Sequence, residues 1–459
     1  MDKFFKLKEH GTNVKTEVVA GLTTFVTMAY IIFVNPSILS ATGMNAGAVT
    51  VATILAAALA TFIMGFIANV PYALAPGMGL NAFFAFAVCL GPLKMPWQQA
   101  LAIVFICGII NIIITVTRIR KSIILAIPES LQYAISGGIG LFIAYIGFMD
   151  GFLLQFTPQG KADAIGNFEK VVPALVNFSR PESVLTLIGL GIIVVLMLLK
   201  VKGSILIGVV ATTLIGIPMG VTDVSVFESF KFAVPDLSPT LLKLDFAGLF
   251  GDASRLPTIL TLILAFSLAD TFDTIGTFLG TGRKTGIFDN KDEESLNKGK
   301  GFSSKLDKAL FADATATSVG ALLGTSNTTT YIESASGISA GGRTGLTSVV
   351  TGIAFLLMLF ISPFAVIVPW SATAPALIVV GILMMESIAK VKWDDFEDAA
   401  SAFFTAVIMP FTYSIANGVA AGFLFYVIVK IVKGKAKEVH PIMYIVTALF
   451  ILNFVINAL

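Results

Sequence analysis

The sequence has little charge and almost no cysteine or histidine. Charged residues make up 13% of the 459 residues, against about 25% in soluble domains. Cys89 and Cys107 are the only cysteines, and His10 and His440 are the only histidines. These absences exclude a disulfide framework and leave no thiolate or histidine metal site. We therefore expect neither a metal nor a cofactor.

Motifs for phosphate binding and for intramembrane catalysis are also missing. Residues 280–286 read GTGRKTG, which lacks the G-x-x-x-x-G-K-[ST] spacing of a phosphate-binding loop. An intramembrane enzyme needs His pairs, a Ser-Lys pair or aspartates on facing helices, whereas Asp270 and Asp273 share one predicted helix. The net charge of +2 gives no reason to expect a nucleic acid partner. An enzyme is not expected.

Long apolar runs dominate what is present. Hydrophobic residues make up 56% of the chain, and runs of about 20 apolar residues are typical of membrane-spanning helices. The protein is therefore predicted to be an all-α, multi-pass membrane protein lying in a lipid bilayer. The predicted spans of the first half are 17–36, 49–68, 72–90, 97–117, 130–149, 183–199 and 203–220. Those of the second half are 257–281, 307–323, 325–342, 345–363, 372–389, 398–414 and 416–433, and a further apolar segment, 441–458, follows them.

The charges at the ends of these spans predict the orientation. Most of the 30 Lys and Arg residues fall on the side of the N-terminus, and cytoplasmic loops are the ones that carry this excess. Residues 1–16 are therefore expected in the cytoplasm. Because each half has an odd number of spans, two similar halves would lie in opposite orientations.

Two segments at corresponding places in the halves are poor continuous helices. They are PYALAPGMGLNAFFAF (71–86) and GTSNTTTYIESASGISAGG (324–342). Interrupted helices at matching positions of two repeats point to the central site of a transporter. Each is predicted to be a short extended piece followed by a half-helix, starting near Met78 and near Ile332.

Four acids lie away from the ends of the predicted spans, where a charge costs at least about 2.5–3.5 kcal/mol. Asp270 and Asp273 lie in LADTFDTIGTFLG (268–280), with Thr274 on the same helical stripe. Glu333 begins the second half-helix, and no Lys or Arg lies within the predicted spans of Asp270, Asp273 and Glu333. Asp270 and Glu333 are the strongest functional candidates, while Asp273 could instead be a structural hydrogen-bond acceptor. Asp313 suits a scaffold or proton path.

These stretches resemble the nucleobase–ascorbate transporters, and within them the AzgA-like guanine/hypoxanthine permeases. The matching segments are GLTTFVTMAYIIFVNP (21–36), APGMGLNAFFAF (75–86), LADTFDTIGTFLG (268–280), ADATATSVGALLGTSNTTTYIESASGI (312–338) and FTYSIANG (411–418). The resemblance implies fourteen spans in two inverted repeats of seven. It also implies a core domain (17–117 and 257–363) and a gate domain (130–220 and 372–433), to which 441–458 is extra.

The resemblance assigns roles by position. Asp270 and Glu333 would bind the substrate, Asp313 would support the site, Asn81 would be the third-span contact, and Asp273 is an acid typical of the AzgA branch. Asp270, Asp273 and Asp313 are the candidates for proton coupling. The Gln-His pair that many relatives have in the first span is absent here, where Phe25–Val26–Thr27–Met28 stands. The contacts of that span are therefore left open.

The chemistry of a 6-oxopurine agrees with these roles. Its N1–H, together with the neighbouring amine of guanine, matches a carboxylate that accepts two hydrogen bonds. Adenine presents a bare N1 acceptor there. Phe83, Tyr331 and Ile332 would supply walls for the planar base, and Thr274 a polar contact.

The sequence thus predicts import of purine bases (hypoxanthine, guanine and, as a further candidate, adenine) by proton symport across the plasma membrane, with Na⁺ as the less favoured coupling ion. Alternatives are a xanthine or uracil carrier, or an ion or anion channel on the same fold, which would need a central positive residue. A homodimer is a family-level expectation only.

Overall fold

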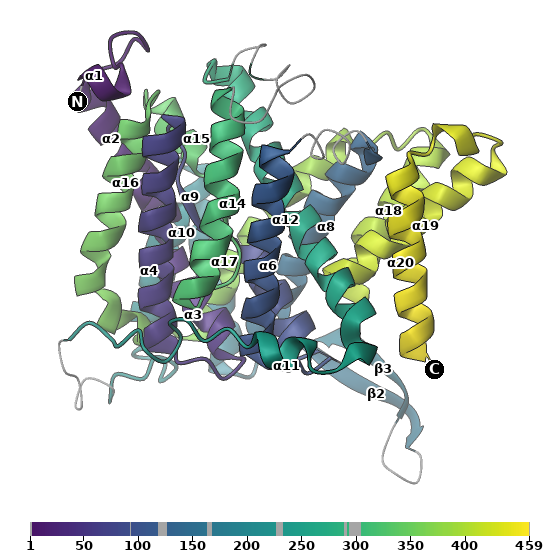
Figure 1. Ribbon diagram of the computed structural model, residues 1–459. Helices are drawn as coiled ribbons and strands as arrows, with labels where there is room; N and C mark the ends of the chain where they lie inside the picture. Colours follow the sequence, from purple (N-terminus) through teal and green to yellow (C-terminus); the bar gives the residue numbers. More distant parts are fainter. Residues whose placement is uncertain are drawn as a thin grey trace.

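The computed structural model describes residues 2–91, 93–117, 126–162, 168–225, 233–288, 292 and 304–458. This part of the chain is a bundle of helices with two two-stranded sheets (Figure 1). Eight of its helical segments are long and apolar enough to cross a membrane. They are Val14–Ser40, Ala46–Ala68, Trp97–Val116, Glu129–Asp150, Pro181–Leu198, Ala253–Ile275, Trp370–Lys390 and Ile415–Val432. Shorter apolar helices lie between them, so the fold is that of a mostly helical, multi-pass membrane protein.

One group of helices contains both broken spans. Within it, α14 contacts α4 and α6, α16 contacts α2 and α4, and α12 contacts α6. Its helices are α2 (Val14–Met28), α3 (Ile31–Ser40), α4 (Ala46–Ile63), α6 (Trp97–Val116), α12 (Leu256–Thr285), α14 (Lys305–Leu323) and α16 (Gly345–Leu357). The predicted span 17–36 lies within the membrane-crossing segment Val14–Ser40, whose helix is interrupted only at Ala29 and Tyr30.

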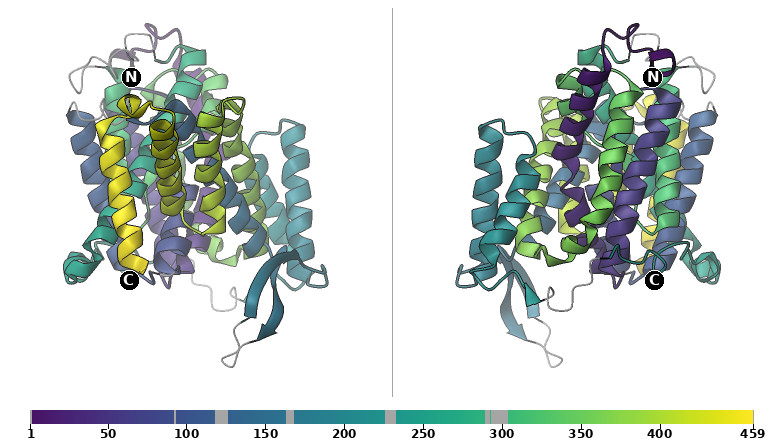
Figure 2. Two further views of the ribbon diagram at one scale, coloured as in Figure 1. Left: turned by 90° about the vertical axis from the view of Figure 1, so that its right-hand side faces the viewer. Right: turned by 90° about the vertical axis from the view of Figure 1, so that its left-hand side faces the viewer.

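A second group of helices packs around α8. Here α8 contacts α17 and α18, α9 contacts α10 and α17, and α18 contacts α19. Its helices are α8 (Glu129–Asp150), α9 (Pro181–Leu198), α10 (Ser204–Gly216), α17 (Trp370–Met384), α18 (Phe396–Phe411) and α19 (Ile415–Val432). The α9–α10 pair stands at the edge of the molecule (Figure 2).

Small residues let α8 and α17 approach closely. A Cβ at Gly381 would lie 2.5 Å from the carbonyl oxygen of Gly140, and one at Gly147 would lie 2.9 Å from that of Ala374. Within a bilayer, helices associate by close van der Waals packing rather than by the hydrophobic effect, which favours glycine at such crossings. A larger side chain at either position would push the two helices apart.

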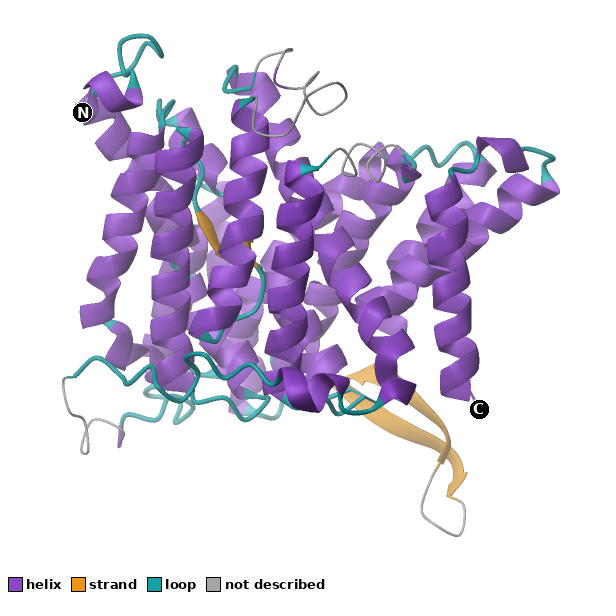
Figure 3. Cartoon of the chain, in the orientation of Figure 1, coloured by secondary structure: helices purple, strands orange, loops and turns teal. Residues whose placement is uncertain are grey.

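The two broken spans meet in the middle of the bundle. Strand β1 (Leu74–Pro76) pairs antiparallel with β4 (Thr328–Thr330), with Ala75 opposite Thr329. Figure 3 shows these strands surrounded by helices. After β1 come α5 (Met78–Ala82) and the π-helical η2 (Phe83–Cys89), and after β4 comes α15 (Ser334–Ser339). The predicted form, an extended piece and then a short helix, is confirmed, although the second helix begins two residues later than Ile332.

Side chains satisfy the backbone that this break exposes. The Thr61 hydroxyl accepts a hydrogen bond from the Leu74 N–H at 3.0 Å, and the Ser334 hydroxyl accepts one from the Ala73 N–H at 3.0 Å. The Ser348 hydroxyl lies 2.7 Å from the carbonyl oxygen of Tyr72. Non-helical backbone is tolerated at membrane depth only where protein or water supplies such partners.

The last helix, α20 (Pro441–Ala458), contacts α19 and α12. It carries the chain end to the face of the bundle opposite the N-terminus (Figure 1). The hairpin of β2 (Leu154–Ala162) and β3 (Phe168–Leu175) projects from that same opposite face. The remaining short elements are α1 (Asp2–Phe5), η1 (Met64–Ala68), α11 (Phe246–Phe250), η4 (Ala253–Arg255), η5 (Met358–Phe360), η6 (Ser362–Ile367), η7 (Met385–Lys390) and η8 (Ala436–Glu438).

Candidate substrate site

Glu333 lies in the turn between β4 and α15, beside the interruption between α2 and α3. The Tyr30 hydroxyl donates a hydrogen bond to Glu333 Oε1 at 2.5 Å. Tyr30 lies in the turn between α2 and α3, and its side chain is buried. The Glu333 side chain is half-buried, and its neighbour Ile332 is 50% exposed. This end of the second broken span therefore has accessible surface.

Asp273 on α12 is, besides Glu333, the one of the four candidate acids that has accessible surface. Its side chain is half-buried, and its carboxylate interacts electrostatically with Glu333 and Asp313. Among the described residues, none donates a hydrogen bond to the Asp273 carboxylate. A half-buried carboxylate without a donor is suited to accept hydrogen bonds from a bound molecule.

Asp270 is directed into the helix packing. Its side chain is fully buried, and Oδ2 accepts hydrogen bonds from Asn111 on α6 at 3.0 Å and from Thr317 on α14 at 3.2 Å. The Ser267 hydroxyl in turn bonds to Asn111 Oδ1. Within the described chain, Asp270 Oδ1 has no hydrogen-bond partner. The carboxylate thus links α12 to α6 and α14 through Oδ2 alone.

Asp313 anchors β4. Its Oδ1 accepts hydrogen bonds from the backbone N–H and the hydroxyl of Thr330, both at 2.8 Å. Its Oδ2 accepts one from the Thr274 hydroxyl at 2.8 Å, and Thr274 also lies 2.8 Å from the Thr329 hydroxyl. Asp313 and Thr274 are both buried. This arrangement supports the scaffold role expected for Asp313.

Asn81, Phe83 and Tyr331 hold the first broken span in place. The Asn81 amide donates to the carbonyl oxygen of Pro76 at 3.3 Å, and its Oδ1 accepts a hydrogen bond from Ser326. The Tyr331 hydroxyl donates to the same Pro76 oxygen at 2.6 Å. The Phe83 ring packs against Phe266 with 4.7 Å between centroids. The structure thus brings the predicted residues together around β1 and β4, but only Asp273, Ile332 and Glu333 have substantial exposed surface.

Two participants were missed by the sequence interpretation. Tyr30 lies in the first matching segment, but nothing local indicates that it reaches Glu333, which is 303 positions away. Asn111 did carry a signal, because it is the amide in the apolar run CGIINIIITV of α6, and polar residues inside a span are costly and functional. In the described part of the chain, no group of three or more His, Cys, Asp or Glu is placed to hold a metal ion.

A helical bundle with two paired, broken spans at its centre and carboxylates beside them is typical of a membrane transporter. The fold is shared with the transmembrane domain of a cyanobacterium bicarbonate transporter, BicA. The two structures superpose with a TM-score of 0.59 at 16% identity, covering 89% of this chain and 97% of that one. At this identity the likeness concerns the fold alone.

The sequence comparison is more specific. Residues 15–421 match the model of the permease family, and the chain belongs to that family. It is 43% identical over 470 residues to the guanine/hypoxanthine permease PbuG of Bacillus subtilis, with 99% of each chain covered. It is 40% identical over 455 residues to the adenine permease AdeP of Escherichia coli, covering 99% of this chain and 96% of that one. The expected family is thereby confirmed, and the protein is a permease rather than an enzyme.

Proposed function

We propose that this permease imports purine nucleobases, with hypoxanthine and guanine as its substrates. The observation that carries the proposal is the pair of accessible carboxylates, Asp273 and Glu333, beside the paired strands β1 and β4. The N1–H and amine of guanine would donate to one carboxylate. The half-exposed Ile332 would form part of the wall against the ring. The names of the relatives support a purine substrate.

Adenine is a second candidate because a relative named as an adenine permease is 40% identical. Its exocyclic amine is a donor, but its N1 is an acceptor that an ionised carboxylate would repel. Uptake of radiolabelled hypoxanthine in cells expressing the permease, with unlabelled guanine, adenine, xanthine and uracil as competitors, tests both candidates. We expect unlabelled guanine to compete strongly and xanthine and uracil to compete weakly. No uptake of hypoxanthine above that of cells lacking the permease would overturn the assignment.

The transport cycle we propose moves two domains past each other. The group of helices that holds the broken spans would be the core domain, and the group around α8 would be the gate domain. Each of two inverted repeats of seven spans would contribute helices to both domains. Substrate would bind between them, at the accessible faces of Glu333 and Asp273. The same carboxylates disfavour an anion channel, because an anion at this place would meet two negative charges rather than a positive one.

Proton symport is the coupling we propose, in a plasma membrane with the N-terminus in the cytoplasm. Asp270 would carry the proton, since one of its buried oxygens has no partner among the described residues. A protonophore should then abolish accumulation at acidic external pH, while replacing sodium changes little. A strict sodium requirement at constant membrane potential would contradict proton coupling and leave the substrate assignment intact.

A further inference from the structure

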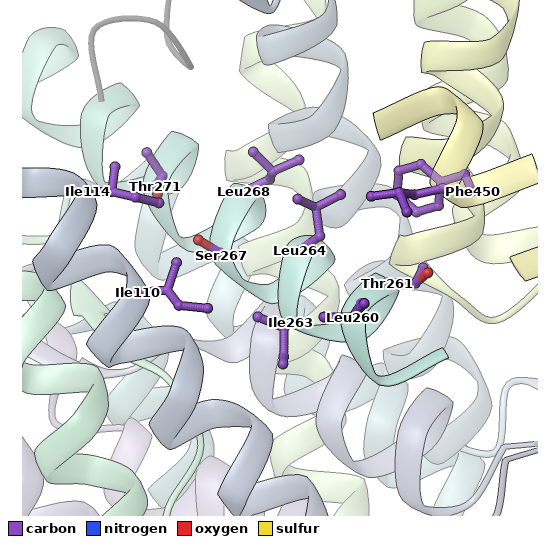
Figure 4. Close-up of a pocket in the computed structure, with 11 residues that line it drawn as sticks. Ile110, Ile114, Leu260, Thr261, Ile263, Leu264, Ser267, Leu268, Thr271 and Phe450 are labelled. Atoms are coloured by element: carbon purple, nitrogen blue, oxygen red, sulfur yellow. The ribbon is translucent and has the colours of Figure 1, made fainter. Parts of the chain in front are cut away.

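An apolar groove of about 240 Å³ lies between α6, α12 and α20. Figure 4 shows its walls, with Ile110 from α6, Leu264 from α12 and Phe450 from α20. Leu260 and Leu449, which also line it, are 47% and 38% exposed. The groove therefore reaches the outer surface of the bundle, where α20 lies (Figure 2).

The hydroxyl groups in the wall offer little to a polar ligand. Thr261 donates its hydrogen bond to the carbonyl oxygen of Pro257 at 2.8 Å, and Ser267 donates to Asn111 Oδ1. Thr271 is the third hydroxyl of the wall, and the other lining residues are apolar. A nucleobase needs several hydrogen-bonding partners, and a buried water needs two to four. Neither finds them here, so the groove suits hydrocarbon.

The position of the groove along the membrane-spanning helices indicates which hydrocarbon can reach it. Helices α6 and α12 form membrane-spanning segments, and Leu449 and Phe450 lie in the middle of α20. The exposed side of the groove therefore faces the hydrocarbon layer of the bilayer. We propose that an acyl chain of a membrane lipid binds in this groove and fills the space between α20 and the α6–α12 pair.

Such a chain would be held by van der Waals contact, the main attraction between apolar surfaces inside a bilayer. It would also lie next to the Asp270 network, because Ser267 belongs both to the groove wall and to the chain of hydrogen bonds from Asn111 to Asp270. The lipid would therefore steady the face of α12 that carries this network. The proposal does not depend on which substrate the permease carries.

Photolabelling tests the site directly. The full-length protein would be reconstituted in vesicles of phosphatidylethanolamine and phosphatidylglycerol that contain a phospholipid with a diazirine near the middle of one acyl chain. After irradiation, peptide mass spectrometry would locate the adducts. We expect several-fold more adduct on the peptides carrying Ile110, Leu264 and Leu449 than on the lipid-facing side of α9, where Leu187 is 43% exposed.

Leu264→Trp should fill the groove and lower the adduct yield there several-fold, while the α9 yield stays constant. Leu187→Trp is the matched control and should leave the groove labelling unchanged. If Leu264→Trp does not fold, Leu449→Trp replaces it, because that position is partly exposed and tolerates a larger ring. Equal labelling of the groove and α9, or groove labelling that survives the tryptophan, would overturn the proposal.

Discussion

The two broken spans share a backbone plan but differ in what they expose. In the first, every side chain from Pro71 to Cys89 is buried. In the second, Ile332 and Ser339 are exposed, and Glu333 is half-buried. The two broken spans therefore differ in exposure: the first is buried around the pairing of β1 with β4, and the second presents the exposed side chains that we propose for substrate binding. The two aspartates of α12 differ in the same way, because Asp270 is buried and Asp273 is half-buried.

The largest effect is expected from Asp270→Asn, which should abolish concentrative uptake. The substitution removes the proposed proton carrier but keeps the shape and the hydrogen-bond acceptor for Asn111 and Thr317. The variant should therefore reach the membrane and still bind hypoxanthine, as measured by uptake together with binding to purified protein. Wild-type accumulation in a variant present at normal surface levels would contradict the proposal that Asp270 carries the proton while Asp273 and Glu333 bind the base.

Asn81→Ala tests whether the first broken span is only a support. It leaves the Ser326 hydroxyl and the Pro76 carbonyl oxygen without one partner each, and an unmade buried hydrogen bond costs about 1–3 kcal/mol. We expect a lower thermal unfolding temperature for the purified permease and an unchanged inhibition constant for hypoxanthine in the folded fraction. A tenfold rise in that constant would instead support the sequence-based assignment of Asn81 to the substrate.

Tyr30→Phe should have the smallest energetic cost of the three substitutions. It removes only the O–H donor to Glu333, and a single hydrogen bond contributes about 0.5–1.5 kcal/mol. Hypoxanthine affinity should therefore change by about two- to tenfold, as measured by competition. Tyr444→Phe is the matched control, because the Tyr444 hydroxyl donates to the Ala436 carbonyl oxygen and not to a residue of the candidate site. If both variants behave like wild type, Tyr30 does not position Glu333.

Much of this arrangement could be predicted from the sequence. Prolines and glycines in 71–86 and the Asn-Thr-Thr-Thr run in 324–342 identified both breaks, and the half-helix at Met78 begins where expected. The orientation of the acids could not be predicted in the same way. Asp270 and Asp273 are only about 60° apart around a helix, so which of them faces α6 depends on Asn111 and Thr317, partners supplied by other helices. The contact between Tyr30 and Glu333 has no local signal, because the two residues are 303 positions apart in the sequence.

The central claim is that Glu333 binds the base, and the inhibition constants of hypoxanthine and adenine for Glu333→Gln test it most directly. The amide keeps one acceptor oxygen but loses the charge, and a hydrogen bond to a charged group contributes about 1.5–3 kcal/mol. Hypoxanthine should therefore bind roughly ten- to a hundredfold more weakly, and the gap to adenine should narrow. Glu386→Gln, an exposed acid beyond the end of α17, should change neither constant. If both constants of Glu333→Gln remain at wild-type values, Glu333 does not contact the base and the account is wrong.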